Sequence, residues 1–265
     1  MRGQAALGRS FLYSGAVAMH RACLFLLMLI AACGARAGEV QVAAAANLAP
    51  AMAKIAAAFQ RDTGHKAVVA IGSTGKFYAQ IRNGAPFEVL LAADAQVPAR
   101  LENEGLAQPG TRFVYAVGRL VLWSGNERTV DRRGEVLRHA ARVRLAIADP
   151  RVAPYGAAAV ETLTNLGLLE SWEPFLVQGE SVGQAYQFTF TGNAPLGFVA
   201  LSQVAEAGRI ARGSGWIVPA RLHAPLHQEA VLLKAGAANP VATAFLVYMR
   251  GNAARAILRN AGYMF

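Results

Sequence analysis

Four short segments of this sequence place neutral hydrogen-bond donors where an apolar strand gives way to a helix. They are centred on Asn47, on Ser73 and Thr74, on Tyr155, and on the pair Ser181–Val182. The first backbone N–H groups of a helix lack partners within the helix, and the helix dipole places partial positive charge there. Such a turn is a ready site for an anion. The four segments together therefore predict an oxyanion site made of amide and hydroxyl groups.

Three of these segments have other interpretations when each is taken alone. Asn47 could simply cap its helix, and Tyr155, which follows a proline suited to a first helical turn, could be a packed ring with an exposed hydroxyl. The stretch GSTGKFYAQI has the GK of a phosphate loop. However, Ala70 stands where that motif needs its first glycine, and Phe77 replaces the metal-binding hydroxyl. A nucleotide P-loop is therefore excluded.

The fourth segment carries a rival chemistry, because GESVG at 179–183 matches the G-x-S-x-G nucleophile elbow. Glu206 and His223 follow Ser181 in the chain order that a serine hydrolase uses. No HGGG-type oxyanion motif precedes the elbow, and a five-residue match arises easily by chance. The histidines are dispersed and form no H-E-x-x-H motif, so we expect no directly bound metal.

The elements that must position these donors alternate along the chain. Apolar strands are predicted at 40–46, 67–73, 88–94, 143–150, 175–181, 196–202 and 230–236. Helices are predicted at 48–61, 75–83 and 96–105, from about 155, from about 183, and within 239–262. This alternation is typical of parallel sheets flanked by helices. A longer run at 111–126 is expected to cross into a second lobe, giving lobe 1 at 38–118, lobe 2 at 119–220 and a return to lobe 1 at 221–265.

Residues 1–37 have the features of a secretory signal peptide. A basic residue precedes the apolar run ACLFLLMLIAAC, and the small-residue site ARA follows it. The apolar run is short for a membrane span. Met19 is a second candidate start, and the segment ending at Cys33 also has the shape of a lipoprotein cleavage box. Because Cys23 and Cys33 both fall in this leader, a soluble mature chain has no disulfide.

Charge and length limit the classes of function. The formal net charge of +10 becomes +6 without the four arginines of the leader, which favours an anionic ligand through long-range attraction. The basic residues are scattered rather than clustered with aromatic ones, so we expect no nucleic-acid binding. The 228 residues after position 37 can bury a large core as one big domain or two small ones.

In order along the chain, these segments resemble the periplasmic molybdate-binding proteins of ABC transporters. The matching stretches are AAAANLAPAM, GSTGKFYAQIRNGAPFEVLLAAD, APYGAAA, ESVGQAYQF and APLGFVALS. The resemblance implies a type II periplasmic-binding-protein fold, with two α/β lobes of mainly parallel sheets flanked by helices and the ligand in the cleft between them. It implies an exported, monomeric protein without catalysis or cofactor. Such a protein captures molybdate and tungstate and delivers them to a membrane permease.

The resemblance also implies which residues hold the ion, all through uncharged donors: Ala46, Asn47, Ser73 or Thr74, Tyr155 and Val182. Thr74 is favoured over Ser73 by its spacing from Asn47, and Val182 would act through its backbone N–H. Two positions depart from patterns known in the family. Ala46 lacks the hydroxyl that a threonine can supply there, and Ala200 stands where better-known members carry a tyrosine.

A shell of neutral donors has physical advantages for this ligand. Burying a lysine or arginine beside the ion would add a desolvation cost comparable to the attraction gained. Hydrogen phosphate carries a proton that needs an acceptor, so a donor-only shell disfavours it relative to fully deprotonated oxyanions. The alternatives left open are a binder of sulfate or another oxyanion, a sensor, and the serine hydrolase. A ferric-ion site is disfavoured, because only Tyr155 is well placed as an anionic ligand.

Overall fold

The computed structural model describes residues 37–139 and 141–265, and Gly38–Phe265 form one compact unit. The signal peptide predicted for residues 1–37 therefore lies almost wholly outside the described residues, and so do Met19, Cys23 and Cys33. Within the described ranges, no helix combines the length and the apolar character that a membrane crossing demands.

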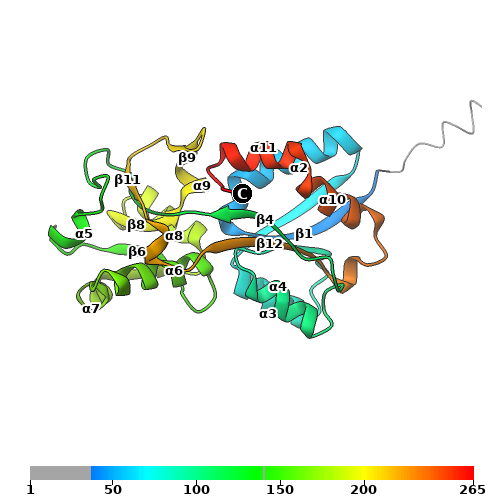
Figure 1. Cartoon of the computed structure of the whole chain (residues 1–265), viewed down its shortest axis with the longest axis horizontal. Helices are drawn as coiled ribbons and strands as arrows, with labels where there is room; N and C mark the ends of the chain where they lie inside the picture. Colours follow the sequence, from blue (N-terminus) through cyan, green and yellow to red (C-terminus); the bar gives the residue numbers. More distant parts are fainter. Residues whose placement is uncertain (1–36, 140) are drawn as a thin grey trace, which may run out of the picture. The chain divides into compact units, whose positions relative to one another are not determined.

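The first sheet has the strand order β2-β1-β3-β12-β4. Its strands are β1 (Glu39–Ala45), β2 (Lys66–Gly72), β3 (Val89–Leu91), β4 (Phe113–Gly118) and β12 (Leu226–Leu232). One face is covered by α2 (Ala49–Thr63), α10 (Pro240–Arg250) and α11 (Asn252–Asn260), and the other by α3 (Thr74–Arg82) and α4 (Gln96–Asn103) (Figure 1). Because helices cover both faces, β1 can be built almost entirely of buried valine and alanine.

The second sheet has the order β11-β5-β8-β6-β7. Its strands are β5 (Leu120–Ser124), β6 (Leu145–Ala148), β7 (Leu176–Gly179), β8 (Leu196–Ala200) and β11 (Ser214–Ile217). The accompanying helices are α5 (Val136–His139), α6 (Pro154–Asn165), α7 (Leu169–Trp172), α8 (Val182–Phe190) and α9 (Leu201–Val204). A two-stranded ribbon of β9 (Ala205–Glu206) and β10 (Arg209–Ile210) follows α9, and the sequence patterns did not predict it.

Both sheets are mixed, where we expected mainly parallel ones. The pairs β1–β2, β1–β3, β6–β7 and β6–β8 are parallel, whereas β12 pairs antiparallel with β3 and β4, and β5 pairs antiparallel with β8 and β11. The antiparallel strands β4, β5, β11 and β12 are those that flank the two crossings between sheets, at 118–120 and 217–226. The chain leaves one sheet through β4 or β11 and enters the other through β5 or β12, so no strand–helix–strand unit imposes a parallel direction on these crossings.

The α2 helix shows why the sequence folds as predicted near the first donor turn. It is preceded by the short 3-10 helix η1 (Ala46–Leu48), and proline occupies its first turn. Met52, Ile55 and Phe59 form the buried face predicted from their spacing. The helix ends at Gly64, whose φ of 74° is the left-handed conformation that favours glycine at this position. The helix start is therefore held firmly against the first sheet.

Candidate anion-binding site

A small cavity lies where the four predicted turns meet. All six residues predicted to hold the ion line this cavity, together with five neighbours; the full lining is Ala45, Ala46, Asn47, Gly72, Ser73, Thr74, Ala93, Ala153, Pro154, Tyr155 and Val182. None of the lining residues is charged. The structure thus brings together residues that are separated by more than 130 positions in the sequence.

Hydrogen-bond partners are missing at this cavity. Among the described residues, four buried side-chain atoms have no partner: Asn47 Oδ1, Ser73 Oγ, Tyr155 OH and Glu229 Oε2. The first three belong to residues of the cavity wall. The Ser73 and Tyr155 hydroxyls can each donate a hydrogen bond to a polar ligand in this space, whereas Asn47 Oδ1 can only accept one.

At the first turn, a network of side chains fixes the Asn47 amide. Its Nδ2 donates to Gln228 Oε1 and to the Tyr263 hydroxyl, each at 2.7 Å. The Gln228 Nε2 donates in turn to the carbonyls of Ala93 and Leu226, at 3.2 and 2.9 Å, and this fixes which end of the glutamine faces Asn47. We expected the Asn47 amide to donate to the anion, but here both of its hydrogens are taken by the protein. The backbone N–H at this helix start is the donor that remains.

At the second turn, the two hydroxyl residues have different surroundings. Thr74 Oγ1 accepts a hydrogen bond from the Ala93 backbone N–H at 3.0 Å. Ser73 is 4% exposed, stands at the N-cap of α3, and its Oγ has no partner. The sequence spacing favoured Thr74, whereas the hydrogen bonding favours Ser73 as the hydroxyl available to a ligand.

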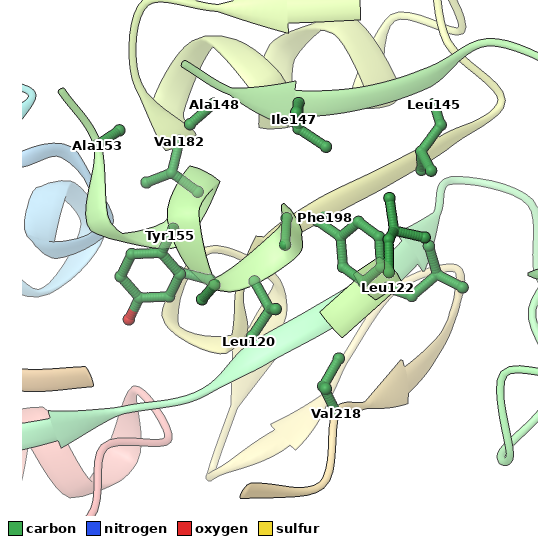
Figure 2. Close-up of a cluster of buried hydrophobic side chains, with 14 of the residues drawn as sticks. Leu120, Leu122, Leu145, Ile147, Ala148, Ala153, Tyr155, Val182, Phe198 and Val218 are labelled. Carbon is green, nitrogen blue, oxygen red and sulfur yellow. The ribbon is translucent and has the colours of Figure 1, made fainter. Parts of the chain in front are cut away.

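At the third turn, Tyr155 lies in the first turn of α6 and is 2% exposed. Figure 2 shows its ring at the margin of a buried apolar cluster, with the hydroxyl directed away from Leu122 and Phe198. Burial raises the pKa of the Tyr155 hydroxyl well above its usual value and the neighbouring Tyr263 raises it further, whereas the nearby Asn47 side chain lowers it. The hydroxyl therefore keeps its proton and can donate a hydrogen bond at neutral pH.

At the fourth turn, Ser181 caps helix α8 by accepting a hydrogen bond from the Gln184 N–H at 3.3 Å. Val182 begins the helix and lines the cavity. Throughout residues 37–139 and 141–265, no hydrogen bond joins Ser181 to His223 or Glu206; His223 Nδ1 instead lies 2.7 Å from the Ala224 carbonyl oxygen. The arrangement required for a hydrolase triad is thus not formed. Nor do the described residues contain a cluster of three metal-binding side chains.

With this geometry in place, comparison with known proteins gives the family. The sequence matches the model of the bacterial extracellular solute-binding proteins over residues 40–264. The chain belongs to this family. Because the family consists of binding proteins, the serine-hydrolase hypothesis for the elbow at Ser181 is dropped in favour of a helix cap.

Curated relatives narrow the comparison. The molybdate-binding protein ModA of Azotobacter vinelandii is 53% identical over 232 residues, which are 88% of this chain and 92% of the relative. The ModA protein of Rhodobacter capsulatus is 50% identical over 231 residues, 87% of this chain and 90% of the relative. A solved structure of the periplasmic molybdate-binding protein of Azotobacter vinelandii superimposes with a TM-score of 0.82 and 42% identity, covering 85% of this chain and 99% of that one.

Sequence reasoning missed two residues of this solute-binding protein that build the site. Gln228 is fully buried on β12, and Tyr263 lies beyond the last helix, yet both hold Asn47. Tyr263 OH also donates to the Asn47 carbonyl at 3.1 Å, and Ser202 Oγ donates to the same carbonyl at 2.7 Å. Gln228 stands between the polar residues His227 and Glu229, so no local signal in the sequence indicated that it would be buried at the site.

Proposed function

We propose that this protein captures molybdate outside the cytoplasm and delivers it to the membrane permease of an ABC transporter. The observation that carries the proposal is the uncharged cavity where two unpartnered hydroxyls, of Ser73 and Tyr155, and four helix starts converge. The names of relatives that are 53% and 50% identical support molybdate as the ion. Tungstate, an ion of the same shape and charge, is proposed as a second ligand.

The geometry supports a particular set of donors. We propose that the Ser73 and Tyr155 hydroxyls and the backbone N–H groups of Ala46, Asn47 and Val182 hold the oxyanion. Thr74 Oγ1 accepts from a backbone N–H but keeps its own proton, so it remains an additional donor. Each hydrogen bond to a charged acceptor contributes about 1.5–3 kcal/mol. Several such bonds replace the water that the ion leaves behind.

Uncharged donors suit a protein that must later release its ligand. A buried lysine or arginine would require desolvation of a second full charge, and it would be left unpaired when the ion departs. Helix N-termini hold their partial charge in place and remain partly hydrated when the cleft opens. Residues 38–118 with 221–265 and residues 119–220 are proposed as the two lobes that open, joined by the two crossings.

Oxyanion selectivity can be tested directly. In calorimetric titrations, molybdate and tungstate are expected to bind with micromolar or tighter affinity and to compete with sulfate. Hydrogen phosphate needs an acceptor for its proton, and the unpartnered Asn47 Oδ1 is the one amide oxygen at the site that could serve. Phosphate binding as strong as molybdate binding would show that Asn47 Oδ1 accepts the phosphate proton, and it would contradict the expected selectivity against phosphate.

Thermal unfolding supplies the decisive experiment. With molybdate at about 1,000 times its dissociation constant, binding to the folded state alone adds about 4 kcal/mol to the free energy of unfolding. We expect a clear rise in Tm with molybdate and with tungstate, and none with chloride. If neither molybdate nor tungstate raises the Tm, the proposal is wrong. If sulfate alone raises the Tm, the protein is a sulfate binder instead.

Export and assembly complete the proposal. We propose that residues 1–37 direct the chain to the periplasm and are then removed, leaving a monomer. Mass measurement of the exported protein distinguishes a chain that begins near Gly38 from one that begins at a lipid-modified Cys33. Light scattering of the purified mature chain tests the monomeric state.

A further inference from the structure

The first turn of α3 contacts the second lobe directly, beside the cavity. Gly75 donates its backbone N–H to the Val152 carbonyl at 2.9 Å. Gly75 follows the Ser73–Thr74 turn, and Val152 lies two residues before Pro154, in the loop that leads to Tyr155. This hydrogen bond therefore joins the turn that carries one unpartnered hydroxyl to the turn that carries the other.

The contact is possible only because position 75 has no side chain. A Cβ placed there would lie 2.8 Å from Val152 Cα, 2.9 Å from Val152 O and 3.0 Å from Val152 Cβ. Two of these atoms are backbone, so they cannot turn aside as a flexible side chain would. The φ of Gly75 lies outside the positive range, and alanine is a better helix former than glycine. The glycine is thus required by the approach of the lobes and not by its own backbone conformation.

The next residue makes a second contact with the same lobe. Lys76 Nζ forms an ion pair with Glu180, the residue that precedes the Ser181–Val182 turn. Both side chains are substantially exposed, at 44% and 73%. Two successive residues of α3 thus touch the two turns of the second lobe that line the cavity.

We propose that Gly75 and Lys76 are positioning residues that set how far the cleft closes. This inference rests on the proposed function, because it explains how Tyr155 and Val182 come within reach of an ion held by Ser73. The backbone contact at Gly75 sets the closing distance, and the Lys76–Glu180 pair holds the closed form without touching the ion. A side chain at position 75 would hold the lobes apart and leave the oxyanion shell incomplete.

The test compares Gly75→Ala with the wild-type mature protein. The variant is expected to bind molybdate at least about 10-fold more weakly, as when one hydrogen bond to a charged acceptor is lost. Its Tm without ion is expected to be equal or slightly higher. Gly125→Ala is the matched control, since the nearest atom to a Cβ there is 3.7 Å away and the residue does not line the cavity. Weaker binding by both variants alike would overturn the assignment.

The ion pair gives an independent measurement. Lys76→Ala and Glu180→Ala are each expected to speed molybdate dissociation by no more than about fivefold, because the pair is exposed. Molybdate should dissociate from the double variant no faster than from either single variant. The charge exchange Lys76→Glu with Glu180→Lys should bring the dissociation rate part of the way back to that of the wild type. Additive losses would show that the two side chains act separately and would overturn their part of the proposal.

A measurement of size rather than of affinity separates this inference from the proposed function. Small-angle X-ray scattering should give Gly75→Ala a larger radius of gyration than the wild type at matched concentration and in the presence of molybdate. If the wild type binds no molybdate yet the variant is still more expanded, the proposed function fails while the closure role stands. Equal radii together with equal affinities would refute the closure role itself.

Discussion

Removing the Tyr155 hydroxyl should change binding and stability in different directions. In the structure this hydroxyl is buried and has no hydrogen-bond partner among the described residues. Loss of a hydrogen bond to the oxyanion costs about 1.5–3 kcal/mol, so Tyr155→Phe should weaken molybdate binding about 10- to 150-fold. An unsatisfied buried polar group is itself unfavourable by about 1–3 kcal/mol. The variant should therefore lose no stability without the ion, and gains some if the closed form is populated.

Tyr115→Phe is the matched control for this prediction. Tyr115 is equally buried, but its hydroxyl donates to the Ala92 carbonyl at 3.1 Å and does not line the cavity. Its removal should lower the free energy of unfolding by about 1 kcal/mol and leave molybdate affinity unchanged. Denaturant unfolding gives the free energy of unfolding of each variant, and calorimetric titration gives the molybdate affinity of each. If Tyr155→Phe loses stability as Tyr115→Phe does and binds as well as the wild type, the hydroxyl has no role with the ion.

Three further predictions follow from the same geometry. Gln228→Leu removes the acceptor for the Asn47 amide, so the free energy of unfolding, measured with denaturant, should fall by about 2–3 kcal/mol and molybdate should bind more weakly in calorimetry. An unchanged free energy of unfolding would show that this hydrogen-bond network does not stabilise the protein. Gly118→Ala places a Cβ 2.2 Å from the Tyr155 hydroxyl and so displaces it. Molybdate binding, measured by competition titration, should weaken at least as much as in Tyr155→Phe, about 10-fold or more. Burial raises the pKa of Tyr155 and Tyr263, so molybdate affinity should stay constant from pH 7 to 10, where an ordinary tyrosine is about half ionised. Above about pH 10 the unfolded chain loses protons that the folded chain keeps, so stability should fall by about 1.4 kcal/mol per pH unit for each such tyrosine; a fall in affinity that begins near pH 9 would contradict the raised pKa values.

The helix starts that carry the site could be predicted because their signals are local. Alternating apolar strands and amphipathic helices give the positions of four turns, and the observed helices η1, α3, α6 and α8 begin at 46, 74, 154 and 182, within two residues of the predictions. Parallel strands that end at one edge of a sheet bring such turns together. Each residue predicted to hold the ion could therefore be placed at this cavity from its position at a strand end and from the family resemblance.

What could not be predicted depends on contacts between distant parts of the chain. Asn47 is held by Gln228 and Tyr263, which are 181 and 216 positions away, and no local pattern encodes that pairing. The same holds for Thr74, whose hydroxyl accepts a hydrogen bond from the distant Ala93 N–H and keeps only its own proton to donate. Strand direction was also beyond local patterns, because β12 enters the first sheet from the other lobe and pairs antiparallel on both sides.

The unpartnered groups at the cavity explain how binding can be coupled to closure. Ser73 Oγ comes from the first lobe and Tyr155 OH from the second, and in the closed form neither has a protein partner. Closing without an ion therefore removes water from both hydroxyls and gives them no other hydrogen-bond partner, which costs a free energy of about 1–3 kcal/mol for each hydroxyl. The oxyanion that we propose to lie between them would satisfy both at once, so its binding free energy would favour the closed form over the open one. We propose that the same unsatisfied donors, by making the empty closed state unfavourable, let the permease distinguish a loaded protein from an empty one.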